Sequence, residues 1–179
     1  AALADDGLWY IAGTNLKHYA FNAATPEILS SQLPPISSCQ IIRAGNQLYV
    51  IADDTLSVFN AALEKIYSPV TFAQFDAGSN TLLYGNDNEL EIYTPARHSS
   101  ELLLRSITPI TDAVLNQQTG YVLFANDGKI KAAELDGRDH RNIYTLLATK
   151  PDFADFAVSA DGTQLYTINQ SSLDRYRIR

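Results

Sequence analysis

Short apolar runs recur along the chain at similar spacing. Five of them align without gaps, and they begin at Leu8, Leu48, Leu82, Val122 and Leu165. In every copy the residue eight positions later is again aliphatic, which gives Leu16, Leu56, Leu90, Ile130 and Leu173. Three positions further on stand Tyr19, Phe59, Tyr93, Ala133 and Tyr176. A repeat of roughly 40 residues indicates one supersecondary unit that is used five times.

A turn-rich patch separates the two apolar segments of each copy. Two examples are Asp53-Asp54-Thr55 and Asn126-Asp127-Gly128. Asn, Asp and Gly tolerate the positive φ angles of tight hairpin turns. Each copy is therefore predicted to contain a hairpin of two strands, named b and c here. Strand b is almost wholly apolar, as is typical of a strand that is covered on both faces.

Two further strands fit into the repeat. A strand a is predicted before strand b, at residues 36–44, 72–77, 110–117 and 153–160. A strand d is predicted after strand c, at residues 27–33, 64–67, 101–105 and 141–147. A proline then follows each strand d, at Pro34 (with Pro35), Pro69, Pro109 and Pro151. Because proline cannot donate a hydrogen bond to a sheet, these prolines indicate where one sheet ends and the next begins.

Four antiparallel strands per repeat predict an all-β fold, a β-propeller of about five blades. The blades would span residues 1–34, 35–68, 69–108, 109–150 and 151–179. A β-sandwich also has short strands and frequent turns, but it does not predict five matching hairpins. The first blade is expected to lack strand a, and the last to lack strand d. Two forms of closure remain open: an arc that packs with further blades or a second copy, or a small five-bladed ring.

The last repeat contains Ser159-Ala160-Asp161-Gly162-Thr163-Gln164-Leu165-Tyr166. This segment resembles the S-P-D-G-x-x-L/I-x-Y/F core of the WD40-like repeats in TolB-type β-propellers and related bacterial proteins. The turns at Asp6-Gly7, Gly45-Asn46 and Gly78-Ser79-Asn80 are weaker copies of it. The resemblance implies a scaffold or recognition role rather than a reaction. Similar propellers follow PEGA modules on some bacterial surfaces, which implies an extracytoplasmic or cell-surface part of a larger bacterial protein.

Composition narrows the choice of partners. The formal net charge of -7 argues against a nucleic-acid partner, because such binders gather Lys and Arg against phosphates. No apolar run approaches the ~20 residues that a membrane-spanning helix needs. The single cysteine, Cys39, excludes an internal disulfide and a cysteine-based zinc site, and we expect it to be a small buried thiol.

Two groups of turn residues are candidates for binding. The b–c turns carry Asp53, Asp54, Asp87, Glu89 and Asp127, which would form an acidic rim for a cationic partner or a divalent ion. The alternative is that Asp and Asn are simply hairpin-turn residues, and none follows a spaced D-x-D-x-D-G pattern. The turn with Arg138, His140 and Arg141 could present an arginine fork to a carboxylate or phosphate, or it could be a solvated hairpin on Asp136-Gly137.

No set of residues in the sequence predicts catalysis. There is no G-x-S-x-G segment, the three histidines fall in different elements, and neither a metal nor a cofactor is expected. The leading hypothesis is a non-catalytic recognition module that binds a protein, peptide or glycan through its turn-lined rim. One alternative is part of a propeller hydrolase or lyase whose catalytic residues lie mostly outside this piece. A purely structural stack of blades is another.

Overall fold

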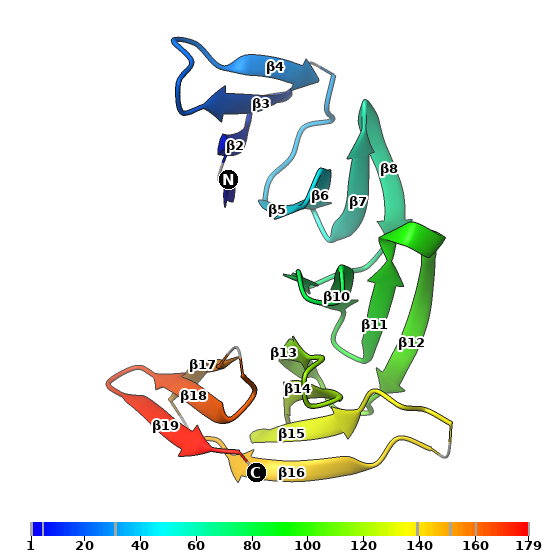
Figure 1. Ribbon diagram of the computed structural model, residues 1–179, viewed down its shortest axis with the longest axis vertical. Helices are drawn as coiled ribbons and strands as arrows, with labels where there is room; N and C mark the ends of the chain where they lie inside the picture. Colours follow the sequence, from blue (N-terminus) through cyan, green and yellow to red (C-terminus); the bar gives the residue numbers. More distant parts are fainter. Residues whose placement is uncertain are drawn as a thin grey trace. The chain divides into compact units, whose positions relative to one another are not determined.

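The computed structural model describes residues 2–4, 6–30, 32–138, 140–150, 152–159 and 161–178. Over these residues the chain is all-β, with five antiparallel sheets and a single turn of 3-10 helix, η1 (Pro95–Arg97). The chain divides into two compact units, residues 1–77 and 78–179, and each is described by itself below. Figure 1 labels most of the strands, which are numbered in chain order.

Unit 1 holds the first two sheets. The first has the order β1 (Ala2–Ala4), β2 (Gly7–Ala12), β3 (Asn15–Ala20) and β4 (Glu27–Ser30). The second has the order β5 (Cys39–Ala44), β6 (Gln47–Ala52), β7 (Thr55–Asn60) and β8 (Ala62–Tyr67). Strand β9 (Phe72–Asp76) ends the unit and is an edge strand of the third sheet, whose order is β12-β11-β10-β9.

Unit 2 holds the remaining strands. Those of the third sheet are β10 (Thr81–Gly85), β11 (Glu89–Thr94) and β12 (Ser99–Arg105). The fourth sheet has the order β13 (Ile110–Asn116), β14 (Tyr121–Asn126), β15 (Lys129–Glu134) and β16 (Ile143–Ala148). The fifth has the order β17 (Phe153–Val158), β18 (Gln164–Asn169) and β19 (Leu173–Arg177). The expected a-b-c-d order is thus confirmed in four sheets, and the fifth ends at strand c.

The first sheet corrects one expectation. We predicted that the first repeat would lack strand a, but β1 pairs antiparallel with β2, and Ala2 lies opposite Trp9. The segment Ala2–Ala4 is too short and too uniformly apolar to show an alternating pattern. The turn that closes the pair ends at Gly7, whose φ of 147° suits glycine.

The repeated anchor of strand c is buried in four of the five sheets. Leu16, Leu56, Leu90 and Ile130 are each 0% exposed. Leu173 occupies the same repeat position but is 68% exposed. Ile130 packs in a core cluster with Phe156 and Leu165 of the next sheet. No further sheet follows β19 among the described residues, so nothing there covers Leu173.

The connections between sheets return to the turn between strands b and c. Backbone N–H groups in these connections donate to turn carbonyls: Leu33 to Thr14 (3.0 Å), Val70 to Asp54 (2.8 Å), Ile110 to Asp87 (2.7 Å) and Thr149 to Gly128 (2.8 Å). Pro34, Pro35, Pro69 and Pro109 lie in these connections, as predicted, while Pro151 is outside the described residues. The b–c turns and the connections therefore lie at the same end of the strands in each of these sheets.

Cys39 is not the buried thiol that we predicted. It is the first residue of β5 and is exposed. The apolar residues that follow it misled the prediction, because burial in β5 begins only at Ile41, which is 5% exposed.

Candidate functional site

Four of the five acidic residues lie in the predicted turns, whereas Glu89 is the first residue of β11. Two of the five are bound within their own sheets. The Asp53 carboxylate accepts the backbone N–H groups of Ser37 and Ser38, each at 3.0 Å from Oδ1. The Glu89 carboxylate pairs with Arg105 Nε at 2.7 Å. Asp53 and Asp54 adopt φ angles of 45° and 64°, as expected of hairpin-turn residues.

The other acidic turn residues are more open. Asp54 and Asp87 are exposed, and the Asp127 carboxylate lies 3.9 Å from Lys129 Nζ. Within the part of the chain that the structure describes, no group of three or more His, Cys, Asp or Glu side chains could hold a metal ion. A binding role for the acidic rim stays a prediction, since within each unit its residues make separate contacts.

Asn126, the last residue of β14, binds the connection that precedes its sheet. Its side-chain amide is buried and donates from Nδ2 to the carbonyls of Thr108 (2.8 Å) and Pro109 (3.2 Å). Lys131 Nζ donates to its Oδ1 at 2.7 Å. Asp53, the turn residue that follows β6, binds the connection that precedes β5 in the second sheet. In these two sheets a polar side chain at or just after the end of strand b therefore binds the preceding connection.

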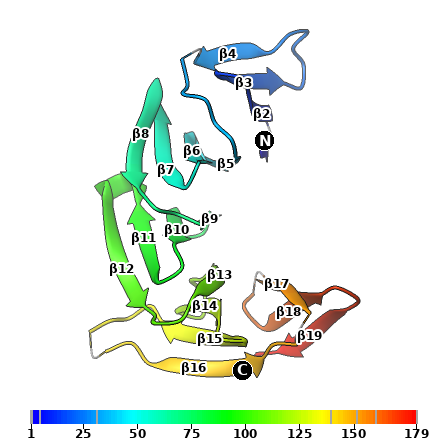
Figure 2. The same cartoon turned by 180° about the vertical axis from the view of Figure 1, so that it is seen from behind.

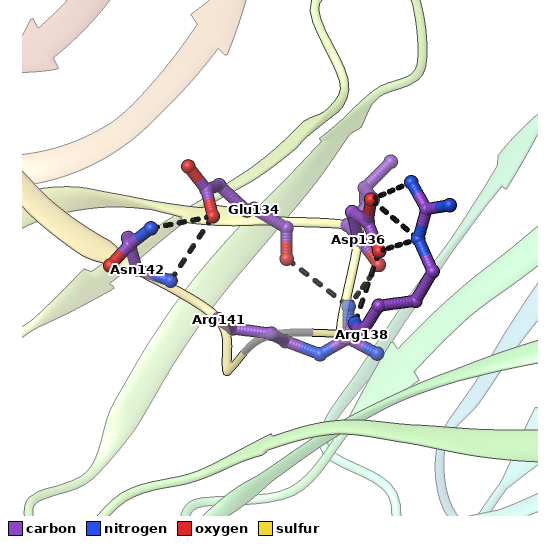
Figure 3. Close-up of polar contacts among 6 residues, drawn as sticks. Glu134, Asp136, Arg138, Arg141 and Asn142 are labelled. Carbon is purple, nitrogen blue, oxygen red and sulfur yellow. Dashed lines mark hydrogen bonds and ion pairs between the residues drawn. The ribbon is translucent and has the colours of Figure 1, made fainter.

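The basic turn is also occupied by internal contacts, which Figure 3 shows. Arg138 forms an ion pair with Asp136, with Nη2 2.6 Å from Oδ2, and this contact holds the pKa of Asp136 at about 2. Arg141 donates to the carbonyls of Glu134 and Leu135 and reaches Glu101 Oε1 at 2.7 Å.

These contacts decide which basic side chains are accessible. The Arg141 side chain is only 14% exposed, whereas that of Arg138 is 86% exposed. His140 is exposed and lies in the same turn with a φ of 72°. The structure thus brings the three predicted basic residues into one turn, but the two guanidinium groups bind different partners within the fold.

The segment that carried the family resemblance has a structural role in this protein. The Asp161 carboxylate accepts hydrogen bonds from the Ser159 hydroxyl (2.6 Å) and the Thr163 backbone N–H (3.1 Å). Gly162 adopts a φ of 70°, and a Cβ there would lie 2.5 Å from the side-chain Nδ2 of Asn116 in the fourth sheet. The motif therefore forms a turn that packs closely on the neighbouring sheet.

A groove of about 550 Å³ lies in unit 2, between the fourth and fifth sheets. We call it the inter-sheet groove, and its walls include Tyr121, Leu123, Tyr144, Leu146, Thr163 and Ile178. The two tyrosine rings meet edge to face at 6.2 Å, and Asn116 and Thr119 add polar groups. This volume falls within the range of roughly 300–1,000 Å³ that is usual for ligand pockets.

The groove exposes side chains that are covered at the matching position of the preceding sheet. Leu147 pairs with Ile130 and Leu104 with Leu90, so Leu146 and Leu103 occupy the same bulged position of strand d. Leu103 is 6% exposed and Leu146 is 37% exposed. Tyr144, also in β16, is 46% exposed. The sequence did not identify β16 as part of a groove, because the exposure of its side chains depends on the residues of the fifth sheet that cover them.

Two aspartates on neighbouring a strands form a second feature that sequence analysis missed. Asp112 in β13 and Asp155 in β17 both lie at irregularities in strand pairing. Asp112 is half-buried, and this burial, together with a hydrogen bond and the charge of Asp155, raises its pKa to about 7. Each aspartate stands ten residues before the first anchor of its strand b, which is the signal that could have paired them.

The raised pKa of Asp112 predicts that stability falls as the pH rises. An unfolded aspartate has a pKa near 4, so between about pH 4 and pH 7 the folded protein holds a proton that the unfolded chain has released. Asp112→Asn should therefore increase the free energy of unfolding at pH 8 by on the order of 1 kcal/mol, a value reduced for solvent screening, and change it little at pH 4.

Urea unfolding at both pH values measures this effect, with Asp87→Asn as the control, because Asp87 is exposed in a turn of the same unit. An equal gain in both variants, or a gain for Asp112→Asn that does not depend on pH, would refute the pairing of Asp112 with Asp155.

Unit 1 contains a cluster built around Trp9. The Trp9 ring stacks on His18 with centroids 4.1 Å apart, and the Arg43 guanidinium lies 5.0 Å from the Trp9 ring centroid. Trp9 Nε1 donates to Asp6 Oδ1 at 3.2 Å, which lowers the pKa of Asp6. These contacts join β2, β3 and β5 and stabilise the packing of the first two sheets.

Comparison with models of known protein families gave no match, and comparison with curated proteins gave none either. Among the described residues, no helix is long and apolar enough to span a membrane.

Proposed function

We propose that the five sheets are blades of a β-propeller, and that the chain is a non-catalytic recognition module whose inter-sheet groove binds a protein or peptide partner. Support for the propeller comes from the shared strand order and from the matching bonds between b–c turns and connections. The TolB-type motif of the last repeat fits this architecture.

The inter-sheet groove is the observation that carries the binding proposal. Its walls are mainly aliphatic and tyrosine side chains with few polar groups, a composition that suits the side chains of a peptide. Tyrosine is also enriched in the core of protein interfaces. A glycan would need many more hydrogen-bonding groups than Asn116, Thr119 and Thr163 supply. The groove therefore replaces the acidic rim as the favoured binding surface.

Selection from a random peptide display library against the wild-type protein tests the proposal. We expect binders whose affinity falls at least tenfold with Leu146→Asp or Tyr144→Ala. The matched control is Leu102→Asp, since Leu102 is 40% exposed on strand d of the third sheet. If the selected binders lose affinity instead with Asp127→Ala, the binding site is the acidic rim. If they lose affinity with Arg138→Ala, it is the basic turn. Failure to select any groove-dependent binder would contradict the proposal.

The Asp112–Asp155 pair favours a second candidate, an acid–base hydrolase. A carboxyl group that keeps its proton near neutral pH and hydrogen-bonds a second carboxyl group is the arrangement that aspartic proteases use for general acid–base catalysis. A panel of fluorogenic peptides assayed between pH 3 and pH 8 tests this candidate. Hydrolysis that Asp112→Asn and Asp155→Asn each abolish would support it, and no hydrolysis by the wild type would rule it out for these substrates.

A further inference from the structure

Among the described residues the fifth sheet ends at strand c, so β19 is an edge strand. The other four sheets each carry a strand d beside strand c, whereas β19, among the described residues, pairs only with β18. Figure 2 shows β19 beside β18 from behind. An edge strand presents backbone N–H and C=O groups that can pair with another chain.

The register of β19 sorts its side chains onto two faces. Tyr176 lies opposite Leu165, which is 2% exposed, and both belong to the core cluster beside the fourth sheet. Arg175 and Arg177 alternate with Tyr176 and are exposed on the other face. A strand added to β19 would therefore meet an apolar position between two cationic ones.

The second sheet shows where the side chains of such a strand would lie. Phe59 holds the same repeat position as Tyr176 and pairs with Leu63 of β8. Leu63 packs into the core cluster between the first two sheets, which also includes Leu29. Leu29 is the bulged residue of its strand d, as Leu146 is in the fourth sheet. By this correspondence, a residue opposite Tyr176 would enter the inter-sheet groove beside Leu146.

We infer that β19 binds an extended peptide segment of a partner protein as an antiparallel fourth strand. The segment carries an aliphatic side chain opposite Tyr176, which fills the groove, and an acidic side chain opposite Arg175. This inference rests on the proposed function and specifies its binding mode. Main-chain hydrogen bonds provide affinity in such strand addition, and the side-chain pockets provide specificity.

The chain itself supplies a template for the probe. In the second sheet, Leu63 of β8 pairs with Phe59, which is equivalent to Tyr176 of the fifth sheet. Glu64 pairs with Val58, which is equivalent to Arg175. A labelled peptide with the sequence of residues 62–67 between Gly-Ser flanks is therefore predicted to bind the wild-type protein. Leu63→Asp in the peptide should weaken binding at least tenfold, and Leu146→Asp in the protein should do the same.

Charge reversal tests the register. Arg175→Glu should weaken binding about threefold, as expected for one exposed cross-strand pair, and Glu64→Lys in the peptide should restore the loss. Arg97→Glu is the control, because Arg97 is exposed in another turn of unit 2 and gives the same change in net charge. Equal losses in both protein variants, or no recovery with the reversed peptide, would overturn the register.

Two N-methylated peptides test the strand pairing itself, one methylated at the position of Glu64 and the other at that of Lys65. Adjacent N–H groups of a strand point to opposite sides, so only one methyl group would face β19. Loss of binding in one peptide alone supports strand addition. Equal behaviour of the two peptides, or no binding by the parent peptide, overturns it. Groove-dependent library binders would in that case leave the proposed function standing without this binding mode.

Discussion

Ile130→Asp should abolish folding, whereas Leu173→Asp should melt within a few degrees of the wild type. The two residues occupy the same position of the repeat, but Ile130 is 0% exposed and Leu173 is 68% exposed. An aspartate at position 130 would be buried among Phe156, Leu165 and other apolar side chains. Burying an unpaired polar or charged group costs several kcal/mol, against a typical total stability of about 5–15 kcal/mol.

Circular dichroism during thermal and urea unfolding measures this contrast. Ile130→Val, with an expected cost of about 0.5–1.5 kcal/mol, keeps the position measurable if the aspartate variant is insoluble. A wild-type melting curve for Ile130→Asp would show that the repeat alignment is wrong. Unfolding of Leu173→Asp would show that β19 is covered by another part of the protein.

Gly162→Ala should destabilise the protein more than Gly45→Ala, although both glycines lie at positive φ, 70° and 56° respectively. A left-handed conformation costs an alanine roughly 1–2 kcal/mol, so each variant should lose about that much. At position 162 the new Cβ would also lie 2.5 Å from Asn116 Nδ2 and 2.7 Å from Thr119 Cγ2. At position 45 it would meet nothing within 4 Å.

The added crowding should bring the loss for Gly162→Ala to about 2–4 kcal/mol. The free energies of unfolding in urea give the comparison directly. Equal losses at the two positions would mean that the turn at Gly162 does not pack on the fourth sheet. They would also remove the structural explanation of the motif that resembles TolB-type repeats.

The repeat could be predicted from sequence because it rests on local spacing. Strands b and c of each copy are joined by a short turn, so apolar anchors such as Leu56 and Ile130 are enough to locate them. The repeat position alone does not decide burial, because the residues that cover a side chain lie outside the local pattern. Leu173 has the same residue type as Leu56, but among the described residues no sheet follows to cover it.

The pairing of Ala2–Ala4 with β2 was missed because this segment has no alternating pattern of its own.

The candidate sites were harder to predict because they join separate sheets. Asp112 and Asp155 come from different a strands, and the groove is lined both by Tyr144 of β16 and by Ile178, the residue that follows β19. The turn residues were easier to predict, since Asp, Asn and Gly are typical of hairpins. Their contacts could not be predicted, because whether the Asp53 carboxylate binds backbone N–H groups or a ligand depends on the preceding connection.

Native-state amide hydrogen exchange tests whether β19 is an edge strand that can accept another strand. β15 lies between β14 and β16 and uses amides on both sides, whereas β19 has β18 on one side only. We expect the amides of β15 to exchange uniformly slowly, and alternate amides of β19 to exchange at least about 100-fold faster than their neighbours. Uniformly slow exchange along β19, matching that of β15, would contradict the proposed strand addition, because it would mean that a fourth strand already pairs with this edge.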